Sequence, residues 1–178
     1  EPSPSSLPQM MASRIVPITW VEVFAEQPLQ GNLLPVLHEA DGVASGVLER
    51  VARRFLQPET SALLSADARG VSYRHRIFTV ASEIPFAGHP SLGAAAAHAH
   101  RSGVRAGTFV QQTLSGRQEL DVDLADGLGR VTLHQDPATF GPVIDPGPIL
   151  EALGLDATAS LPGLPAQIVS TGLPALIL

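Results

Sequence analysis

The sequence predicts an α+β fold in which a mostly antiparallel sheet is wrapped around one central buried helix. Short segments rich in β-branched and aromatic residues, separated by turn residues, are typical of strands. The segment Leu-Gly-Ala-Ala-Ala-Ala at residues 92–97 is apolar on every side, which indicates a helix that is buried all round. Most predicted strands follow one another without an intervening helix, and this order favours α+β over a parallel sheet.

The N-terminal part of the chain is predicted to hold strands and one amphipathic helix. Residues 1–13 are rich in proline and serine without periodicity, and we interpret them as a disordered leader or a cloning remnant. Apolar residues recur at four-residue spacing from Val43 to Phe55, which predicts an amphipathic helix that ends near Pro58. The segments predicted as strands are 15–24, 33–37, 60–64 and 71–79.

The buried helix is predicted to begin at Pro90, because proline suits the first helical position, with His89 just ahead of it. A second, short helix is expected at 149–155. An apolar strand is expected to begin at 175–178, and its unpaired edge would invite association. The other segments predicted as strands are 109–114, 119–124, 130–134 and 167–169.

Composition excludes several kinds of chemistry. The 178 residues contain no cysteine, which rules out disulfides, thiolate nucleophiles and cysteine-based metal sites. All 11 basic residues are arginine, so Schiff-base enzymes, which need a lysine amine, and P-loops are excluded as well. The net charge of −6 argues against nucleic-acid and anionic-membrane partners. Without a bilayer-spanning segment or signal peptide, we expect a cytoplasmic protein. The chemistry that remains is that of carboxylates, imidazoles, hydroxyls, backbone groups and bound ions, and no metal site is predicted.

His89 is the first candidate for chemistry. It follows a tight Ala-Gly turn and stands at the start of the buried helix. The first turn of a helix has free N–H groups that can hold an anion such as a carboxylate, and Gly88 permits close approach to them. An imidazole there could share a proton with the ligand. The alternative is a histidine that merely caps a structural helix.

Glu59 is the second candidate. It follows Pro58 and opens the apolar run of the 60–64 strand. A carboxyl group that enters a low-dielectric region can become a proton carrier near neutral pH. The alternative is an ordinary loop carboxylate ahead of a strand. Spacing alone does not bring Glu59 and His89 together.

These residues lie in motifs that resemble those of the PhzF-like isomerases and epimerases. The run Glu-Ile-Pro-Phe-Ala-Gly-His-Pro-Ser-Leu-Gly at residues 83–93 is similar to the signature of that family. Three more segments agree in order and spacing: Gly-Asn-Leu-Leu-Pro-Val at 31–36, Pro-Glu-Thr-Ser at 58–61 and Ser-Thr-Gly-Leu-Pro at 170–174.

The resemblance implies a diaminopimelate-epimerase-like architecture, in which two similar halves enclose the active site between them. It also implies a cofactor-independent isomerase or epimerase of secondary metabolism that acts on a small carboxylate. Glu59 would move a proton between carbon atoms and His89 would assist, as the catalytic pair. The N–H groups of Gly88 and His89 would hold the substrate carboxylate. The residues expected to bind substrate are Asn32, Gly88, Pro90 and Ser91.

Family members are longer than this chain, so the resemblance implies one half of an active site. We expect an N-terminal domain at 14–165 and, at 166–178, the start of the crossover to an absent second domain. Activity would then need a complementary C-terminal half, as a separate chain or a lost segment, or a homodimer. The alternative is a non-catalytic half-domain that serves as a binding or dimerisation module.

Overall fold

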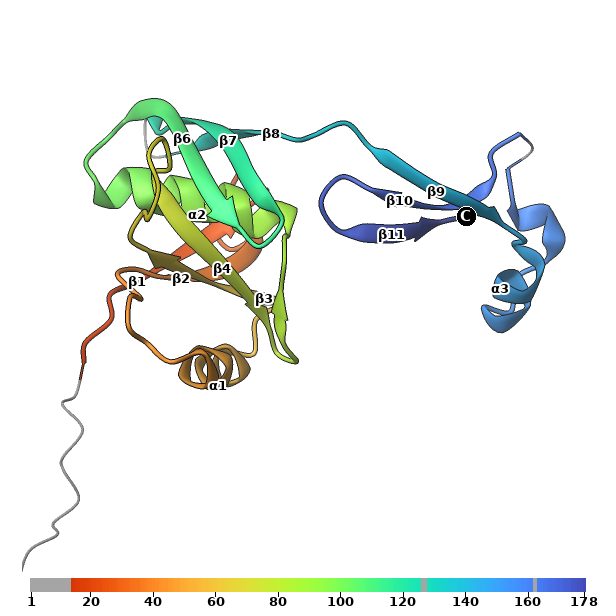
Figure 1. Ribbon diagram of the computed structural model, residues 1–178, viewed down its shortest axis with the longest axis horizontal. Helices are drawn as coiled ribbons and strands as arrows, with labels where there is room; N and C mark the ends of the chain where they lie inside the picture. Colours follow the sequence, from red (N-terminus) through yellow and green to blue (C-terminus); the bar gives the residue numbers. More distant parts are fainter. Residues whose placement is uncertain (1–13, 126–127, 162) are drawn as a thin grey trace, which may run out of the picture.

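The computed structural model describes residues 14–125, 128–161 and 163–178, so the predicted leader lies outside the described residues. It divides into a body, in which a sheet curls around a helix, and an arm that extends from one end of the body (Figure 1). The α+β prediction is confirmed, with a curled sheet as the dominant element.

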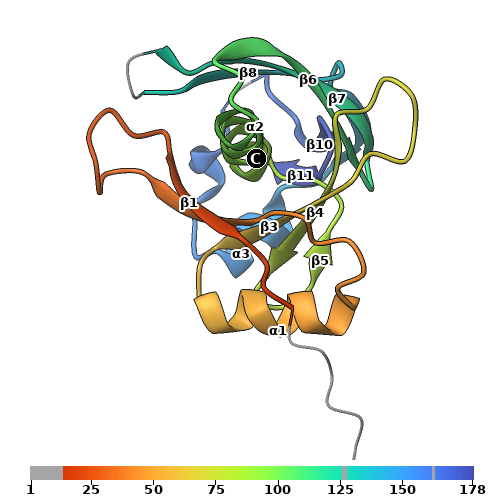
Figure 2. The ribbon, with the colours of Figure 1, turned by 90° about the vertical axis from the view of Figure 1, so that its left-hand side faces the viewer.

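The body sheet has the strand order β1-β2-β3-β4-β6-β7-β8, with β5 paired to β4. Helix α2 (Gly88–Arg101) runs inside its curve, and helix α1 (Ser45–Phe55) lies outside it (Figure 2). The strands are β1 (Ile18–Val23), β2 (Asn32–Leu37), β3 (Glu59–Leu64), β4 (Tyr73–Thr79), β5 (Glu83–Ile84), β6 (Ala106–Thr113), β7 (Gly116–Asp123) and β8 (Arg130–His134).

Two neighbouring strand pairs of the body are parallel, and the others are antiparallel. β2 runs parallel to β3 and β4 parallel to β6. A parallel pair needs a crossover connection, and these two are made through α1 and α2 respectively. Helix α1 therefore connects the neighbouring strands β2 and β3, and helix α2 connects the neighbouring strands β4 and β6.

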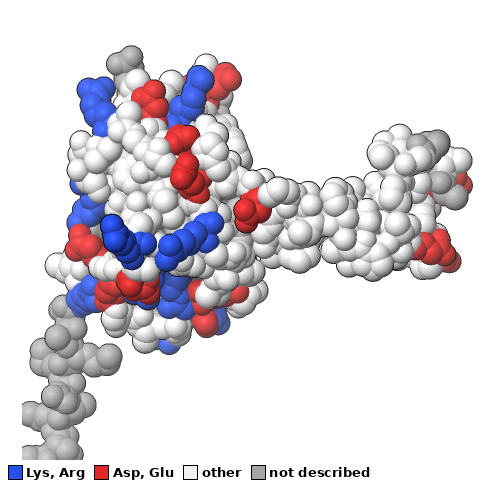
Figure 3. All heavy atoms as spheres, turned by 45° about the horizontal axis from the view of Figure 1, so that its top comes forward, with Lys and Arg blue, Asp and Glu red and all other residues white. Residues whose placement is uncertain are grey.

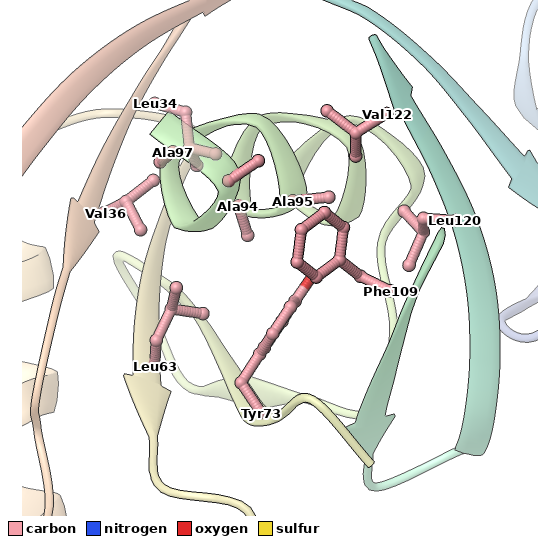
Figure 4. Close-up of a cluster of buried hydrophobic side chains, with 11 residues drawn as sticks. Leu34, Val36, Leu63, Tyr73, Ala94, Ala95, Ala97, Phe109, Leu120 and Val122 are labelled. Carbon is pink, nitrogen blue, oxygen red and sulfur yellow. The ribbon is translucent and has the colours of Figure 1, made fainter. Parts of the chain in front are cut away.

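The core lies between α2 and the inner face of the curled sheet (Figure 4). Small side chains on α2 let the strands approach its backbone closely, and a Cβ added to Gly93 would lie 2.7 Å from Leu34 Cδ2. Tyr73 and Phe109 fill the space on the other side of the helix. The α2 residues buried in this core are Ala94, Ala95, Ala97 and Ala99.

Some element bounds differ from the sequence prediction for identifiable reasons. Helix α2 begins at Gly88, so Pro90 is its third residue rather than its first. This position tolerates proline because the N–H groups of the whole first turn lack intrahelical partners. Helix α1 ends where Leu56 adopts a left-handed conformation with φ 54°. Strand β9 (Thr139–Ile144) was not predicted, since its Gly-Pro pair is unusual inside a strand.

The arm is a three-stranded sheet with the order β11-β10-β9, together with a short helix α3 (Gly147–Ala152). The other two strands are β10 (Ala166–Ser170) and β11 (Pro174–Ile177), and a 3-10 turn η2 spans Ala157–Ala159. Every arginine of the chain precedes the arm in sequence. On the face seen in Figure 3, the body accordingly carries charges of both signs, whereas the coloured side chains on the arm are acidic.

The arm touches the body at the turn between β10 and β11. A Cβ added to Gly172 in this turn would lie 2.6 Å from Phe86 Cδ1, so the glycine packs directly on that ring. The hydroxyl of Ser115 donates a hydrogen bond of 3.3 Å to the carbonyl oxygen of Gly172. Within the described part of the chain, no helix is long and apolar enough to cross a membrane.

Candidate active site

Glu59 and His89, which are separated by 30 positions in the sequence, meet in the structure. Glu59 Oε2 lies 3.4 Å from His89 Nε2. The two side chains are only 20% and 11% exposed, and both facing atoms are buried without a hydrogen-bond partner among the described residues. Each of these two polar atoms is therefore available to interact with the other or with a ligand bound at the site.

The fold brings the pair together through the start of β3 and the start of α2. Glu59 is the first residue of β3, and it pairs with Thr79 at the end of β4. The chain continues from β4 through the short strand β5 into the first turn of α2, where His89 is the second residue. Because the N-terminus of α2 lies at the end of the curled sheet where β3 begins, His89 lies beside Glu59. This end of α2 faces the arm (Figure 1).

Asn32 is the third member of the site. It is the first residue of β2, and its Nδ2 lies 3.4 Å from Nδ1 of His89. An amide nitrogen only donates hydrogen bonds, so Nδ1 accepts and the imidazole proton resides on Nε2, facing the Glu59 carboxylate. Burial lowers the pKa of His89, and the negative charge of Glu59 opposes this shift. The geometry thus favours a neutral imidazole with an Nε2–H directed at Glu59.

The first turn of α2 presents free backbone donors next to this pair. Among the described residues, the N–H groups of Gly88 and His89 donate no hydrogen bond. A Cβ added to Gly88 would meet no atom within 4 Å, so the space beside Gly88 is open. Free N–H groups at a helix N-terminus attract anions through their partial positive charge.

Pro90 and Ser91, also expected to bind substrate, are buried in the same turn. The Ser91 hydroxyl donates a 2.8 Å hydrogen bond to the carbonyl of Ala87, and it accepts one of 2.8 Å from Gln111. Its hydrogen-bonding capacity is therefore used within the protein. A direct contact of either side chain with substrate stays a prediction.

A buried polar cluster behind the site was missed by the sequence analysis. His75 on β4 is 2% exposed and hydrogen-bonds Ser61 on β3 and Gln111 on β6. A signal was present, because the alternation in β4 places His75 on the face shared by Tyr73 and Ile77. A histidine on an otherwise apolar face needs partners, but the pattern does not say which side chains supply them.

Two cavities of the molecule lie away from the Glu59–His89 pair. One of about 580 Å³ is at the other end of α2, against His98 and Arg101. A second of about 730 Å³ lies between β1, α2 and β8. Neither is lined by Glu59 or His89, so the candidate site rests on its polar geometry rather than on an enclosed volume.

Comparison with known proteins identifies the family of the chain. A model of the PhzC-PhzF family, described as phenazine biosynthesis-like protein, matches residues 21–178. The chain belongs to this family. It is 32% identical over 155 residues to the uncharacterized isomerase YddE of Escherichia coli K12. The aligned region covers 85% of this chain and 52% of that protein.

Two further family relatives are informative. A trans-2,3-dihydro-3-hydroxyanthranilate isomerase of Pseudomonas aeruginosa is 32% identical over 136 residues, covering 76% of this chain and 48% of the relative. The solved structure of a predicted epimerase from Pseudomonas aeruginosa superposes with a TM-score of 0.80 at 36% identity, covering 89% of this chain and 57% of that one. The chain thus spans about half the length of the curated relatives it matches.

Proposed function

We propose that this chain provides one half of the active site of a cofactor-independent isomerase or epimerase that acts on a small carboxylate-bearing metabolite. The observation that carries the proposal is the 3.4 Å approach of Glu59 Oε2 and His89 Nε2, both buried beside the N-terminus of α2. The names of the relatives, which are isomerases and an epimerase, support the same reaction class.

In the proposed reaction, the Glu59 carboxylate takes a proton from a carbon atom of the substrate. The C–H electron pair delocalises into an adjacent unsaturated group, and the neutral carboxylic acid forms. The acid then returns the proton to another carbon atom or to the opposite face of the same one, where the electron pair forms a new C–H bond. Atoms and electrons balance without an oxidant or reductant.

His89 supports this proton transfer. Its Nε2–H, held toward Glu59 by the Asn32 contact, can donate to the carboxylate in its charged state. Neutral imidazole leaves Glu59 as the group that carries the proton, and burial favours that neutral form by lowering the pKa of His89.

The N–H groups of Gly88 and His89 are proposed to bind the substrate carboxylate. Their lack of a hydrogen-bond acceptor among the described residues, the open space beside Gly88 and the positive end of α2 support this role. Asn32, beside His89, is proposed to contact the substrate as well. Pro90 and Ser91, which are buried in the same turn, stay predicted substrate contacts.

The complementary half of the site is proposed to complete a diaminopimelate-epimerase-like arrangement of two halves, with residues 166–178 at the start of the crossover. Coverage of about half of each relative supports this proposal. The arm supports it too, because it exposes apolar side chains that a second half would cover. These are Phe140, Val143, Leu176 and Ile177, which are 68%, 65%, 43% and 52% exposed.

Deuterium exchange tests the proposed chemistry. The chain, assembled with a C-terminal half of a family relative, is incubated in deuterated water with trans-2,3-dihydro-3-hydroxyanthranilate, the compound named for one relative. We expect deuterium at a substrate carbon, observed by NMR, and loss of at least 100-fold in its rate in Glu59→Gln. Glu49→Gln on the exposed face of α1 is the matched control and should exchange normally. Undiminished exchange in Glu59→Gln would contradict the role of Glu59.

The alternative function, a non-catalytic binding or dimerisation module, is supported by the same exposed apolar side chains of the arm. It predicts a stable dimer of this chain in light scattering. It also predicts that Phe140→Ser dissociates the dimer, whereas Glu59→Gln leaves it intact. A chain that stays monomeric at high concentration would contradict this alternative.

A further inference from the structure

A continuous chain of buried polar side chains crosses the body sheet behind the site. It begins at Ser61 on β3, passes through His75 on β4 and Gln111 on β6, and ends at Ser91 in the first turn of α2. The successive distances are 2.8 Å, 2.9 Å and 2.8 Å. Ser61, Ser91 and Gln111 are 0% exposed and His75 is 2% exposed.

The donor and the acceptor of each hydrogen bond between these four side chains are determined. Gln111 Oε1 only accepts, so Nδ1 of His75 donates to it, and Nε2 of the same ring must accept from the Ser61 hydroxyl. Gln111 then donates from Nε2 to Ser91, and Ser91 donates to the Ala87 carbonyl. All four hydrogen bonds point in one direction, an arrangement in which each bond polarises the next.

Both ends of this row of hydrogen-bonded side chains lie close in sequence to residues of the site. Ser61 lies two residues after Glu59 on β3, so the two side chains share one face of the strand. Ala87 is the N-cap residue of α2 and lies two residues before His89. The polar chain therefore connects the strand that carries the carboxylate to the turn that carries the imidazole.

Apolar side chains would pack this interior without the cost of burying polar groups. A row of hydrogen-bonded polar side chains instead requires one arrangement of its strands and helix, since any shift leaves a buried donor or acceptor unsatisfied. Burial also lowers the pKa of His75 to about 4, so the ring is neutral at physiological pH and keeps its single tautomer.

We propose that His75 is a positioning residue of the site. Through Ser61 on one side, and through Gln111 and Ser91 on the other, it holds β3 and the N-terminus of α2 at the separation that places Glu59 Oε2 and His89 Nε2 3.4 Å apart. This role rests on the proposed function of the Glu59–His89 pair, but it assigns a task to a residue outside that pair.

The test measures the coupling of the pair directly, without substrate. NMR titration gives the pKa of His89 in the unsubstituted chain and in the Glu59→Gln variant. The carboxylate is the charged group that faces the ring and raises its pKa, so its removal should lower the pKa of His89. The same comparison is then made in two backgrounds, His75→Leu, which removes both hydrogen bonds, and His75→Gln, which keeps a donor and an acceptor.

We expect His75→Leu to reduce the effect of Glu59→Gln to less than about half, and His75→Gln to retain most of it. Equal effects in all three backgrounds would overturn the role of His75 and leave the proposed function standing. A His89 pKa that is insensitive to Glu59 in the unsubstituted chain would overturn the pair, and with it both proposals.

Milder variants keep the test decisive if His75→Leu does not fold. Ser61→Ala and Ser91→Ala each remove one end of the polar chain and should weaken the coupling in the same direction. Thr60→Val is the matched control, because Thr60 carries a buried hydroxyl on the same strand without a hydrogen-bond partner among the described residues. Loss of coupling in Thr60→Val equal to that in Ser61→Ala would count against the proposal.

Discussion

Nδ2 of Asn32 lies 3.4 Å from Nδ1 of His89, and this contact joins the first residue of β2 to the first turn of α2. Its consequence is chemical as well as structural. By donating to Nδ1, the Asn32 amide selects the imidazole tautomer whose Nε2–H is directed at Glu59.

Replacement of Asn32 by Asp should reverse this preference. A carboxylate only accepts, so Nδ1 of His89 would become a donor, and the added negative charge would raise the pKa of His89. Asn32→Leu should instead remove the tautomer preference, because it takes away the amide that donates to Nδ1. Imidazole ¹⁵N chemical shifts report tautomer and titration together. Identical shifts in Asn32→Asp and the unsubstituted chain would contradict the assignment.

Gly172→Ala should disturb the contact between arm and body. The new Cβ would lie 2.6 Å from Phe86 Cδ1, and the backbone has φ 141°, a conformation that side chains rarely adopt. We expect a loss of about 1–3 kcal/mol in the free energy of unfolding, measured in urea, with faster amide exchange in the turn. Gly163→Ala is the control, since Gly163 also has a positive φ of 85° but its Cβ would meet no atom within 4 Å. An equal effect of the two changes would rule out the steric explanation.

Gly93→Ala should destabilise the body by about 1–3 kcal/mol, because the added methyl group would lie 2.7 Å from Leu34 Cδ2 in the core. Gly46→Ala on the exposed face of α1 should have the opposite sign, with a gain of up to about 1 kcal/mol from helix propensity. Thermal or urea unfolding measures both effects. An unchanged free energy of unfolding in Gly93→Ala would show that α2 can move away from β2 without loss of stability.

Acid should destabilise the fold before its carboxylates are protonated. The pKa of His75 is lowered to about 4 by burial, so between pH 6.5 and pH 4 the unfolded chain binds a proton that the folded chain does not. The contribution of His75 is complete above pH 6.5, and below it this residue alone should reduce the free energy of unfolding by about 1.4 kcal/mol per pH unit. Urea titrations across this window measure the slope.

The His75→Gln variant is the control for this slope, which should become shallower without vanishing. His38, whose pKa burial also lowers to about 4, contributes in the same direction. If His75→Gln kept the full slope, His75 would not be the group responsible.

Much of the local structure could be predicted because it depends on short-range patterns. The Ala-rich run marked the buried helix, and alternation located β8 at its observed bounds and most other strands to within a few residues. Predictions failed where a local signal opposed the tertiary environment. Pro90 suggested a helix start, yet α2 begins two residues earlier, and the Gly-Pro pair concealed β9, which pairing with β10 stabilises.

The candidate site divides in the same way. The sequence by itself singled out the candidates for chemistry: Glu59 and His89 lie in motifs that resemble those of one family, and the absence of cysteine and lysine removed competing mechanisms. Only the tertiary structure decided that their side chains meet at 3.4 Å, and that His75 belongs to the hydrogen-bonded chain behind them. The reason is physical, since side-chain periodicity assigns a residue to a face, whereas distances between faces depend on strand order and on how α2 crosses the sheet.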